Sequence, residues 1–122
     1  MMEFILTESE FNEDNTAWNG NRFLMGNGYF GIRGTLEEYT KKQMCAVNTA
    51  GIYDKMGNSW RESVNAPNPL YTYIKVNGKI YALPDEKPKF HQQELDFRYG
   101  IHSRVTHWQT EHGNITVVCE RF

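Results

Sequence analysis

The run Gly26-Asn27-Gly28-Tyr29-Phe30-Gly31-Ile32-Arg33-Gly34 decides how this chain folds. Its four glycines alternate with aromatic and aliphatic side chains. Glycine at this density indicates a backbone that takes positive φ, or that packs too close to a neighbour for a side chain. Asn27-Gly28 is a strong hairpin signal, because both central residues of a type I′ turn need positive φ. We therefore predict a β-hairpin, with strands at residues 22–25 and 29–32.

Two other interpretations of the glycine run do not agree with the residues around it. Gly26, Gly28 and Gly31 match the Gly-x-Gly-x-x-Gly pattern of dinucleotide-binding proteins, but that pattern must open a helix, and Gly34 falls where the helix should begin. A kinase glycine-rich loop is excluded as well. Arg33 stands where valine is usual, and no Asp-Phe-Gly follows in the chain. The glycines therefore indicate structure rather than nucleotide binding.

Composition narrows the classes of function. The 122 residues suffice for one domain, and 13 basic against 15 acidic residues without a basic run argue against nucleic acid as a partner. No stretch approaches the ~20 apolar residues of a membrane span, and no signal peptide is visible, so we expect a cytoplasmic protein with no membrane partner. Aromatic residues make up 14% of the chain, which fits a β-rich core or sugar stacking.

The order of patterns along the chain predicts an all-β fold. Seven or eight short strands, little helix and no parallel βαβ rhythm indicate an antiparallel β-sandwich. Segments expected to lack strands are the loop 12–21 with Trp18, a solvated connection or short helix at 36–44, and a long loop at 54–69. The expected strands lie at residues 1–11, 45–53, 71–83 with a turn at Asn77-Gly78, 90–110 with a bend at Gly100, and 115–122.

Few residues carry a pattern typical of catalysis. Glu37 and Glu38 are adjacent and would face opposite sides of a strand, and the other carboxylates are scattered, so we expect structural or solvated carboxylates and no catalytic residue. The spacing of His91, His102, His107 and His112 fits no metal motif, and we predict neither a metal site nor an organic cofactor. Cys45 and Cys119 form no CxxC; they fit a reducing compartment, with one disulfide left open.

Four further side chains stand out by their chemistry or their place in the sequence. Arg33 could bind phosphate or a carboxylate through its guanidinium, and we favour a buried ion pair with Glu37 or Glu38. Trp108 is expected in the core. Trp60 and Arg61 lie in the long loop, and we predict them as a possible interface with sugar, with a second domain or with another subunit.

Five colinear pieces of the sequence resemble the N-terminal domain of glycoside hydrolase family 65. The signature comprises Gly26, Asn27, Gly28, Tyr29, Gly31, Arg33 and Gly34, followed by Glu37-Glu38. The other pieces are Glu8 with Phe11, Ala50-Gly51-Ile52-Tyr53-Asp54, Asn68-Pro69-Leu70 with Asn77-Gly78, and Leu95-Asp96-Phe97-Arg98-Tyr99-Gly100 with Arg104 and Trp108. The resemblance covers nearly the whole chain.

This resemblance implies a fold and a function. Residues 1–122 would form part of an N-terminal β-sandwich, and the catalytic (α/α) barrel would lie outside this chain. The parent enzyme would be an inverting α-glucoside phosphorylase of the maltose type, in which phosphate is co-substrate and a barrel glutamate is the general acid. The present segment would be an inactive scaffold whose partners are the barrel, an α-linked disaccharide in the parent enzyme and a second copy in a homodimer.

Two alternatives stay open from the sequence. The parent could be a trehalase-like hydrolase of the same family, in which water replaces phosphate; the residues that decide this would lie in the barrel. The chain could also be a free carbohydrate-binding β-sandwich, which predicts a row of exposed aromatic side chains and affinity for sugar without any enzyme.

Overall fold

The computed structural model describes residues 4–34, 36–41 and 45–122. One 3-10 helix, η1 (Glu13–Asn15), leads into one α-helix, α1 (Thr16–Arg22). The strands are β1 (Ile5–Glu8), β2 (Met25–Gly26), β3 (Phe30–Arg33), β4 (Ala46–Thr49), β5 (Tyr53–Asp54), β6 (Glu62–Ser63), β7 (Ile74–Val76), β8 (Lys79–Tyr81), β9 (Phe90–Asp96), β10 (Ile101–Thr110) and β11 (Gly113–Arg121).

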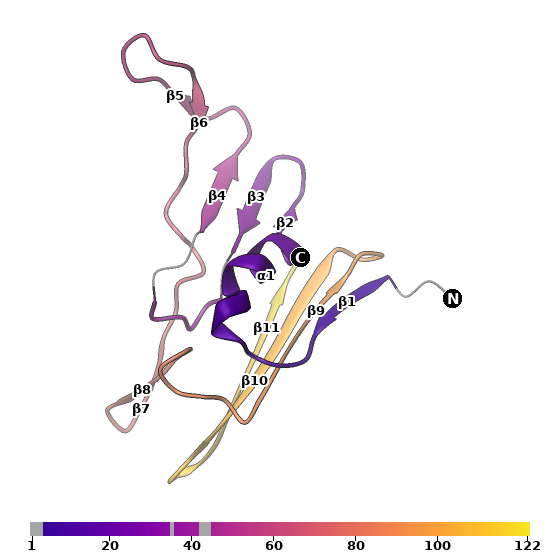
Figure 1. Cartoon of the computed structure of the whole chain (residues 1–122), viewed down its shortest axis with the longest axis vertical. Coiled ribbons are helices and arrows are strands. Elements are labelled where there is room, and N and C mark those ends of the chain that lie inside the picture. The colour runs from indigo at the N-terminus through magenta and orange to yellow at the C-terminus, as the bar shows by residue number, and fades with distance from the viewer. Residues whose placement is uncertain (1–3, 35, 42–44) are drawn as a thin grey trace.

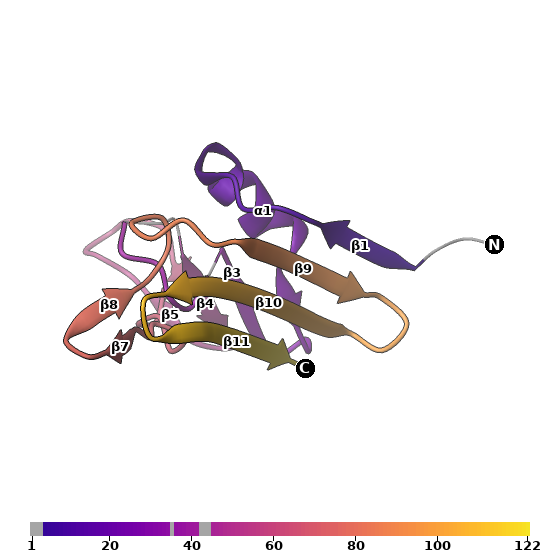
Figure 2. The same ribbon diagram turned by 90° about the horizontal axis from the view of Figure 1, so that it is seen from below.

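The largest sheet contains four antiparallel strands in the order β1-β9-β10-β11. Figure 2 shows these strands side by side, with β1 and β11 at the two edges. Burial alternates along β9 and β10, so that one face of the sheet is turned to the interior. This is the period of two that strand geometry imposes. The inner face is unusual in being mostly polar, with His91, Gln93, His102, Arg104 and Thr106 all buried.

Three smaller sheets complete the strand structure. Strands β2, β3 and β4 form an antiparallel sheet that begins in the glycine run. Beyond it, β5 and β6 form a short ladder at the end of an arm that extends away from the main sheet (Figure 1). Strands β7 and β8 form a hairpin at the lower left of Figure 1, well away from that arm.

The inner face of the main sheet is covered by residues 36–40 and 81–83. These segments run beside each other, with a parallel bridge between Tyr39 and Leu83 and a 2.7 Å hydrogen bond from Leu83 N to Glu38 O. Their apolar side chains meet those of the sheet in one core, which consists of Leu36, Tyr39, Tyr81, Leu83 and Trp108. Removing this apolar surface from water is the main stabilising term.

The predicted all-β antiparallel fold is confirmed. At Asn77-Gly78 both residues have positive φ, 48° and 86°, as a type I′ turn between β7 and β8 requires. The stretch 90–110 forms two strands, and the bend at Gly100 is the turn between them. Trp108 is 2% exposed and lies in the core, as expected.

The glycine-run hairpin is present, but its turn lies one residue later than predicted. Asn27 N donates to Phe30 O at 3.1 Å, which places Gly28 and Tyr29 at the centre of the turn, and only Gly28 has positive φ. The Asn27 side chain accepts from the amides of Tyr29 and Phe30 at 3.0 and 2.8 Å. Asn27 therefore closes the turn with its side chain instead of occupying a central position.

Several segments differ from the prediction. The expected strand at 1–11 is limited to β1 at Ile5–Glu8, and residues 1–3 lie outside the described residues. The expected loop at 54–69 contains β6 and the last residue of β5. Residues 13–22 are helical instead of a loop, and Arg22 ends α1, so that the expected strand at 22–25 is reduced to Met25 in β2. Residues 36–39 are neither helical nor solvated: all four are buried. Lys41 forms an ion pair with Glu13, and residues 42–44 lie outside the described residues.

Candidate functional site

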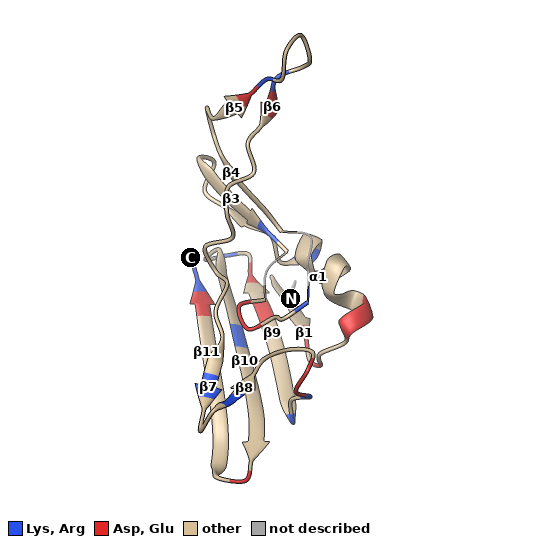
Figure 3. Ribbon diagram, turned by 90° about the vertical axis from the view of Figure 1, so that its left-hand side faces the viewer, with Lys and Arg blue, Asp and Glu red and all other residues tan. Residues whose placement is uncertain are grey.

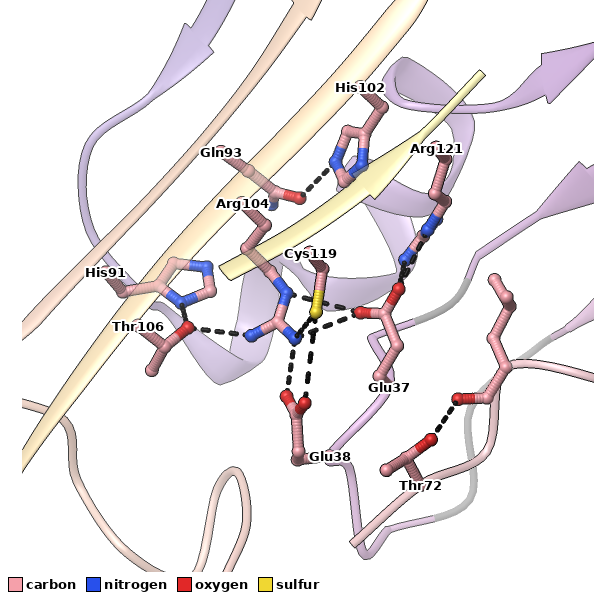
Figure 4. Close-up of polar contacts among 11 residues, drawn as sticks. Glu37, Glu38, Thr72, His91, Gln93, His102, Arg104, Thr106, Cys119 and Arg121 are labelled. Atoms are coloured by element: carbon pink, nitrogen blue, oxygen red, sulfur yellow. Dashed lines mark hydrogen bonds and ion pairs between the residues drawn. The ribbon is translucent and has the colours of Figure 1, made fainter. Parts of the chain in front are cut away.

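One row of side chains crosses the inner face of all four main strands. Strand pairing sets Glu8 opposite Gln93, Gln93 opposite Arg104, and Arg104 opposite Cys119. Residues directly opposite each other on one face are close enough to interact. Gln93 Nε2 donates to Glu8 Oε2 at 2.6 Å, and Arg104 Nη2 lies 3.0 Å from Cys119 Sγ. Gln93, Arg104 and Cys119 of this row belong to a buried polar network, which Figure 4 shows.

Arg104 is the centre of the network. Its guanidinium donates to Glu37 Oε2 at 3.2 Å, to Glu38 Oε2 and to Thr106 Oγ1 at 2.7 Å. Burial opposes its charge, but the carboxylates of Glu38 and Glu37 more than compensate and raise the pKa of Arg104. A fully buried guanidinium needs this many acceptors, because an unpaired buried charge costs several kcal/mol, on the order of 3–5.

Glu37 bridges two arginines. Its Oε1 accepts from Arg121 at 2.9 and 2.6 Å, and its Oε2 faces Arg104. Burial raises the pKa of Glu37, but Arg121 and Arg104 outweigh it, so that the net shift is downward. The adjacent Glu38 also contacts Arg104, so these neighbours converge on one cation (Figure 4) instead of facing opposite sides as expected.

Two buried histidines flank Arg104. His91 Nδ1 lies 3.1 Å from Thr106 Oγ1, and His102 Nε2 lies 3.3 Å from Gln93 Oε1. Burial lowers the pKa of both to about 4; Arg104 adds to the effect at His91, and Arg121 at His102. Both imidazoles are therefore neutral near pH 7.

This network is suited to holding structure and not to transferring protons to a substrate. A general acid needs a raised pKa, whereas that of Glu37 is lowered. Burial raises the pKa of the Cys119 thiol, which disfavours the nucleophilic thiolate. Cys45 and Cys119 are both free thiols. Within residues 4–34, 36–41 and 45–122, no group of three or more His, Cys, Asp or Glu side chains could hold a metal ion.

The glycine signature packs against α1. Arg33 Nε donates to Asn21 Oδ1 at 2.6 Å, and its Nη2 donates to Ala17 O at 3.3 Å. Its expected partners Glu37 and Glu38 are instead hydrogen-bonded to Arg104 and Arg121. Gly20 faces Gly34 so closely that a Cβ on Gly20 would lie 2.6 Å from the Gly34 Cα. The signature therefore joins the hairpin to the helix.

Trp60 and Arg61 lie far from this network. They belong to the β5–β6 arm, where Trp60 is 89% exposed. Tyr53, Met56 and Ile52 are exposed on the same arm. Acidic and basic positions lie close together there (Figure 3), and Arg61 lines an open depression with Gly51, Tyr53, Asp54 and Lys55. The structure thus separates the predicted interface residues from the signature residues.

The buried network was not predicted as a set, although one signal for it was present. Arg104, Thr106 and His102 share strand parity with Trp108, which was expected in the core. That parity places all of them on the buried face.

A further property concerns membranes: among the described residues, no helix is long and apolar enough to cross a bilayer.

Comparison with known proteins assigns the family. Residues 6–122 match the model of the glycosyl hydrolase family 65 N-terminal domain. The chain is 52% identical over 121 residues to a nigerose phosphorylase of Lachnoclostridium phytofermentans, and 32% identical over 120 residues to a kojibiose phosphorylase of Halothermothrix orenii. These alignments cover 99% and 98% of this chain, but 16% and 15% of the relatives.

A solved structure has the same fold. It belongs to a protein from the human microbiome that is assigned as a kojibiose phosphorylase, and it matches 99% of this chain with a TM-score of 0.87 at 22% identity. Only 18% of that protein is covered, so the chain spans less than a fifth of the proteins it matches here. The expected resemblance is thereby confirmed: the chain belongs to glycosyl hydrolase family 65, and residues 6–122 are sequence of its N-terminal domain.

Proposed function

We propose that this chain is a non-catalytic scaffold in the N-terminal domain of an inverting α-glucoside phosphorylase. Residues 1–122 supply part of the domain, and the catalytic (α/α) barrel belongs to the remainder of the protein. The observation that carries this proposal is the 52% identity to a nigerose phosphorylase over 99% of the chain. That relative also makes nigerose the first disaccharide to test, ahead of maltose.

The proposed reaction is phosphorolysis of an α-linked glucose disaccharide. An oxygen of inorganic phosphate attacks the anomeric carbon, and the bond from that carbon to the bridging oxygen breaks. A carboxylic acid of the barrel protonates the departing oxygen. Attack from the opposite face inverts the configuration and gives β-glucose 1-phosphate and a free sugar. Phosphate is the nucleophile and a co-substrate, and we propose no organic cofactor.

The described carboxylates support a role outside catalysis. Glu37 and Glu38 are held by arginines, and Glu8 accepts from Asn19 and Gln93. Inverting enzymes need one carboxylic acid poised to give up its proton to the leaving oxygen. Burial raises the pKa of Glu37, but Arg121 and Arg104 outweigh it, so Glu37 favours the ionised form and is poorly suited to that step.

The β5–β6 arm is the proposed contact with the remainder of the enzyme. It carries several exposed apolar side chains besides Trp60, and a two-stranded ladder of this size has little stability alone. We propose that Trp60 and Arg61 pack against the barrel near the substrate entrance or against a second copy of the protein. The two free thiols support a cytoplasmic location.

Phosphorolysis by the full-length protein tests the proposal. The protein would be incubated with nigerose, kojibiose, maltose or trehalose, with and without phosphate, while glucose 1-phosphate and its anomeric form are followed. The 122-residue chain alone serves as the control. We expect β-glucose 1-phosphate from the full-length protein only, and only in the presence of phosphate.

Three other outcomes of this experiment would contradict the proposal. Glucose released without phosphate would identify a hydrolase of the same family. Product formed by the 122-residue chain alone would contradict its scaffold role. Sugar binding by that chain, combined with no turnover by the full-length protein, would support a carbohydrate-binding module.

A further inference from the structure

A small cavity lies between α1 and the inner face of the main sheet. It is lined by Thr16, Asn19 and Phe23 on the helix side and by Glu8, His102 and Arg121 on the sheet side, among others. Its volume is about 20 Å³. A cavity needs roughly 10–15 Å³ to hold a water molecule, whereas pockets for organic ligands have about 300–1,000 Å³. The volume therefore fits one water-sized molecule and excludes a sugar.

Two buried polar atoms of the cavity lining have no hydrogen-bond partner within the described part of the protein. They are Thr16 Oγ1 and His102 Nδ1. His102 is only 1% exposed, so bulk water does not reach its ring. Buried polar groups are paired in the great majority of cases, because each unpaired group costs about 1–3 kcal/mol. Two such atoms at one small cavity point to a shared partner.

The neighbours of His102 fix which ring nitrogen needs that partner. Gln93 uses its amide nitrogen to donate to Glu8, so its amide oxygen faces His102. His102 Nε2 must then carry the hydrogen and donate, which leaves Nδ1 of the neutral ring as an acceptor. The partner of Nδ1 must therefore be a donor. The Thr16 hydroxyl can both donate and accept, so it is compatible with any small polar partner.

We propose that this cavity is a binding site for one internal water molecule. The water donates to His102 Nδ1 and hydrogen-bonds to Thr16 Oγ1, and thereby connects α1 to the buried polar network of the sheet. One molecule would satisfy both orphan atoms. Internal waters make about three hydrogen bonds on average, and the polar lining residues Glu8, Asn19 and Arg121 offer further partners.

A crystal structure of the full-length protein, at a resolution that places ordered waters, tests the proposal. We expect a single density peak within hydrogen-bond distance of both His102 Nδ1 and Thr16 Oγ1. A cavity without density, a peak that contacts neither atom, or a direct bond from the Thr16 hydroxyl to His102 would overturn it.

Substitutions at Thr16 supply a second measurement. Thr16→Val keeps the shape but removes the hydroxyl, so we expect a lower denaturation midpoint and weakened or lost density at the site. Thr16→Ser keeps the hydroxyl and should retain the water. Thr7→Val is the matched control, since Thr7 is exposed on β1. A shift for Thr16→Val no larger than that for Thr7→Val would contradict the proposal.

Discussion

Arg104 and Glu38, which lie 66 residues apart in the chain, form an ion pair whose side chains are 0% and 2% exposed. Such a pair holds the segment at residues 36–40 against the middle of β10. Burying two charges is costly, so the pair is tolerated because further hydrogen bonds satisfy both ions. Removing one ion would leave the other unpaired in the interior.

Replacement of Arg104 tests this dependence. We expect Arg104→Met to lower the free energy of unfolding by about 3–5 kcal/mol, because Glu37 loses one of its two arginines and Glu38 its only described cation. Urea unfolding of the unmodified protein and of the variant measures this change in the free energy of unfolding. Arg98→Met is the control, since Arg98 pairs with Asp96 at the exposed turn. Equal effects of the two substitutions would contradict the structural role of Arg104.

Stability should fall with pH below neutrality because of His91 and His102. Their pKa is about 4 in the folded protein and near 6.5 when unfolded. Between these values the unfolded state binds more protons, so the free energy of unfolding falls as the pH falls from 6.5 to about 4. Each histidine contributes on the order of 3 kcal/mol once this window is crossed. Glu37 acts in the same direction at lower pH, since its folded pKa lies below its unfolded value.

Urea midpoints measured between pH 7 and pH 5 check this expectation. His91→Gln removes one of the two titrating groups and should flatten the dependence of the midpoint on pH. A dependence as steep as that of the unmodified protein would show that His91 does not contribute to it.

The contact between Gly20 and Gly34 predicts the effect of adding one methyl group. Alanine favours helices over glycine by about 1 kcal/mol, which alone would make Gly20→Ala stabilising. A Cβ at Gly20 would lie 2.6 Å from the Gly34 Cα, and backbone cannot yield as a flexible side chain does. We therefore expect a net loss of about 1–3 kcal/mol, as for other overpacked sites.

Gly31→Ala, a glycine of the signature itself, is the matched control. A Cβ at Gly31 would have its nearest neighbour at 3.7 Å, an ordinary contact. Thermal unfolding of both variants should show a lowered midpoint for Gly20→Ala only. A stabilised Gly20→Ala protein would mean that α1 and the hairpin separate easily.

Under the proposed function, Trp60 should matter to the activity of the full-length protein and little to the stability of this domain. Its side chain is almost fully exposed, so Trp60→Ala should leave the unfolding midpoint nearly unchanged. If the arm packs on the barrel or on a second copy, the same change should reduce phosphorolysis or dimer affinity by roughly tenfold or more, as at other buried aromatic anchors.

Trp18→Ala is the control for this experiment, because Trp18 is also exposed but lies on α1. Activity assays and sedimentation of the full-length variants separate the two possible contacts. Equal effects at both tryptophans, or none at Trp60, would remove the arm from the proposed interface.

The sequence predicted the parts of this fold that depend on local chemistry. The turns at Asn77-Gly78 and Gly100 need residues that tolerate positive φ, and Trp108 is large and apolar enough to indicate the core. Helix α1 escaped prediction because its sequence Thr-Ala-Trp-Asn-Gly-Asn-Arg has low helix propensity. Contacts with distant residues, such as Arg33 and Gly34, support it instead.

The polar network was not predicted either, because it also depends on contacts between distant segments. Strands β9 and β10 carry polar residues on both faces, so the usual apolar and polar alternation does not mark the inner face. The partners of Arg104 lie in a different segment, and a single sequence carries no record of that pairing. The sequence likewise cannot predict what Trp60 and Arg61 contact, since their expected partner lies outside the chain.

The row Glu8, Gln93, Arg104 and Cys119 has a consequence for how the sheet aligns as it forms. A slip of β10 by one residue would turn Arg104 toward solvent and bring Ser103 or Val105 inward. Glu37 would then keep only Arg121, and Glu38 would be enclosed without a counter-charge. In a sheet with an apolar inner face, such a slip would turn the apolar side chains toward solvent. Here the slip would in addition leave charged side chains buried without a partner, so the ion pairs add to the free-energy difference between the native register and a shifted one.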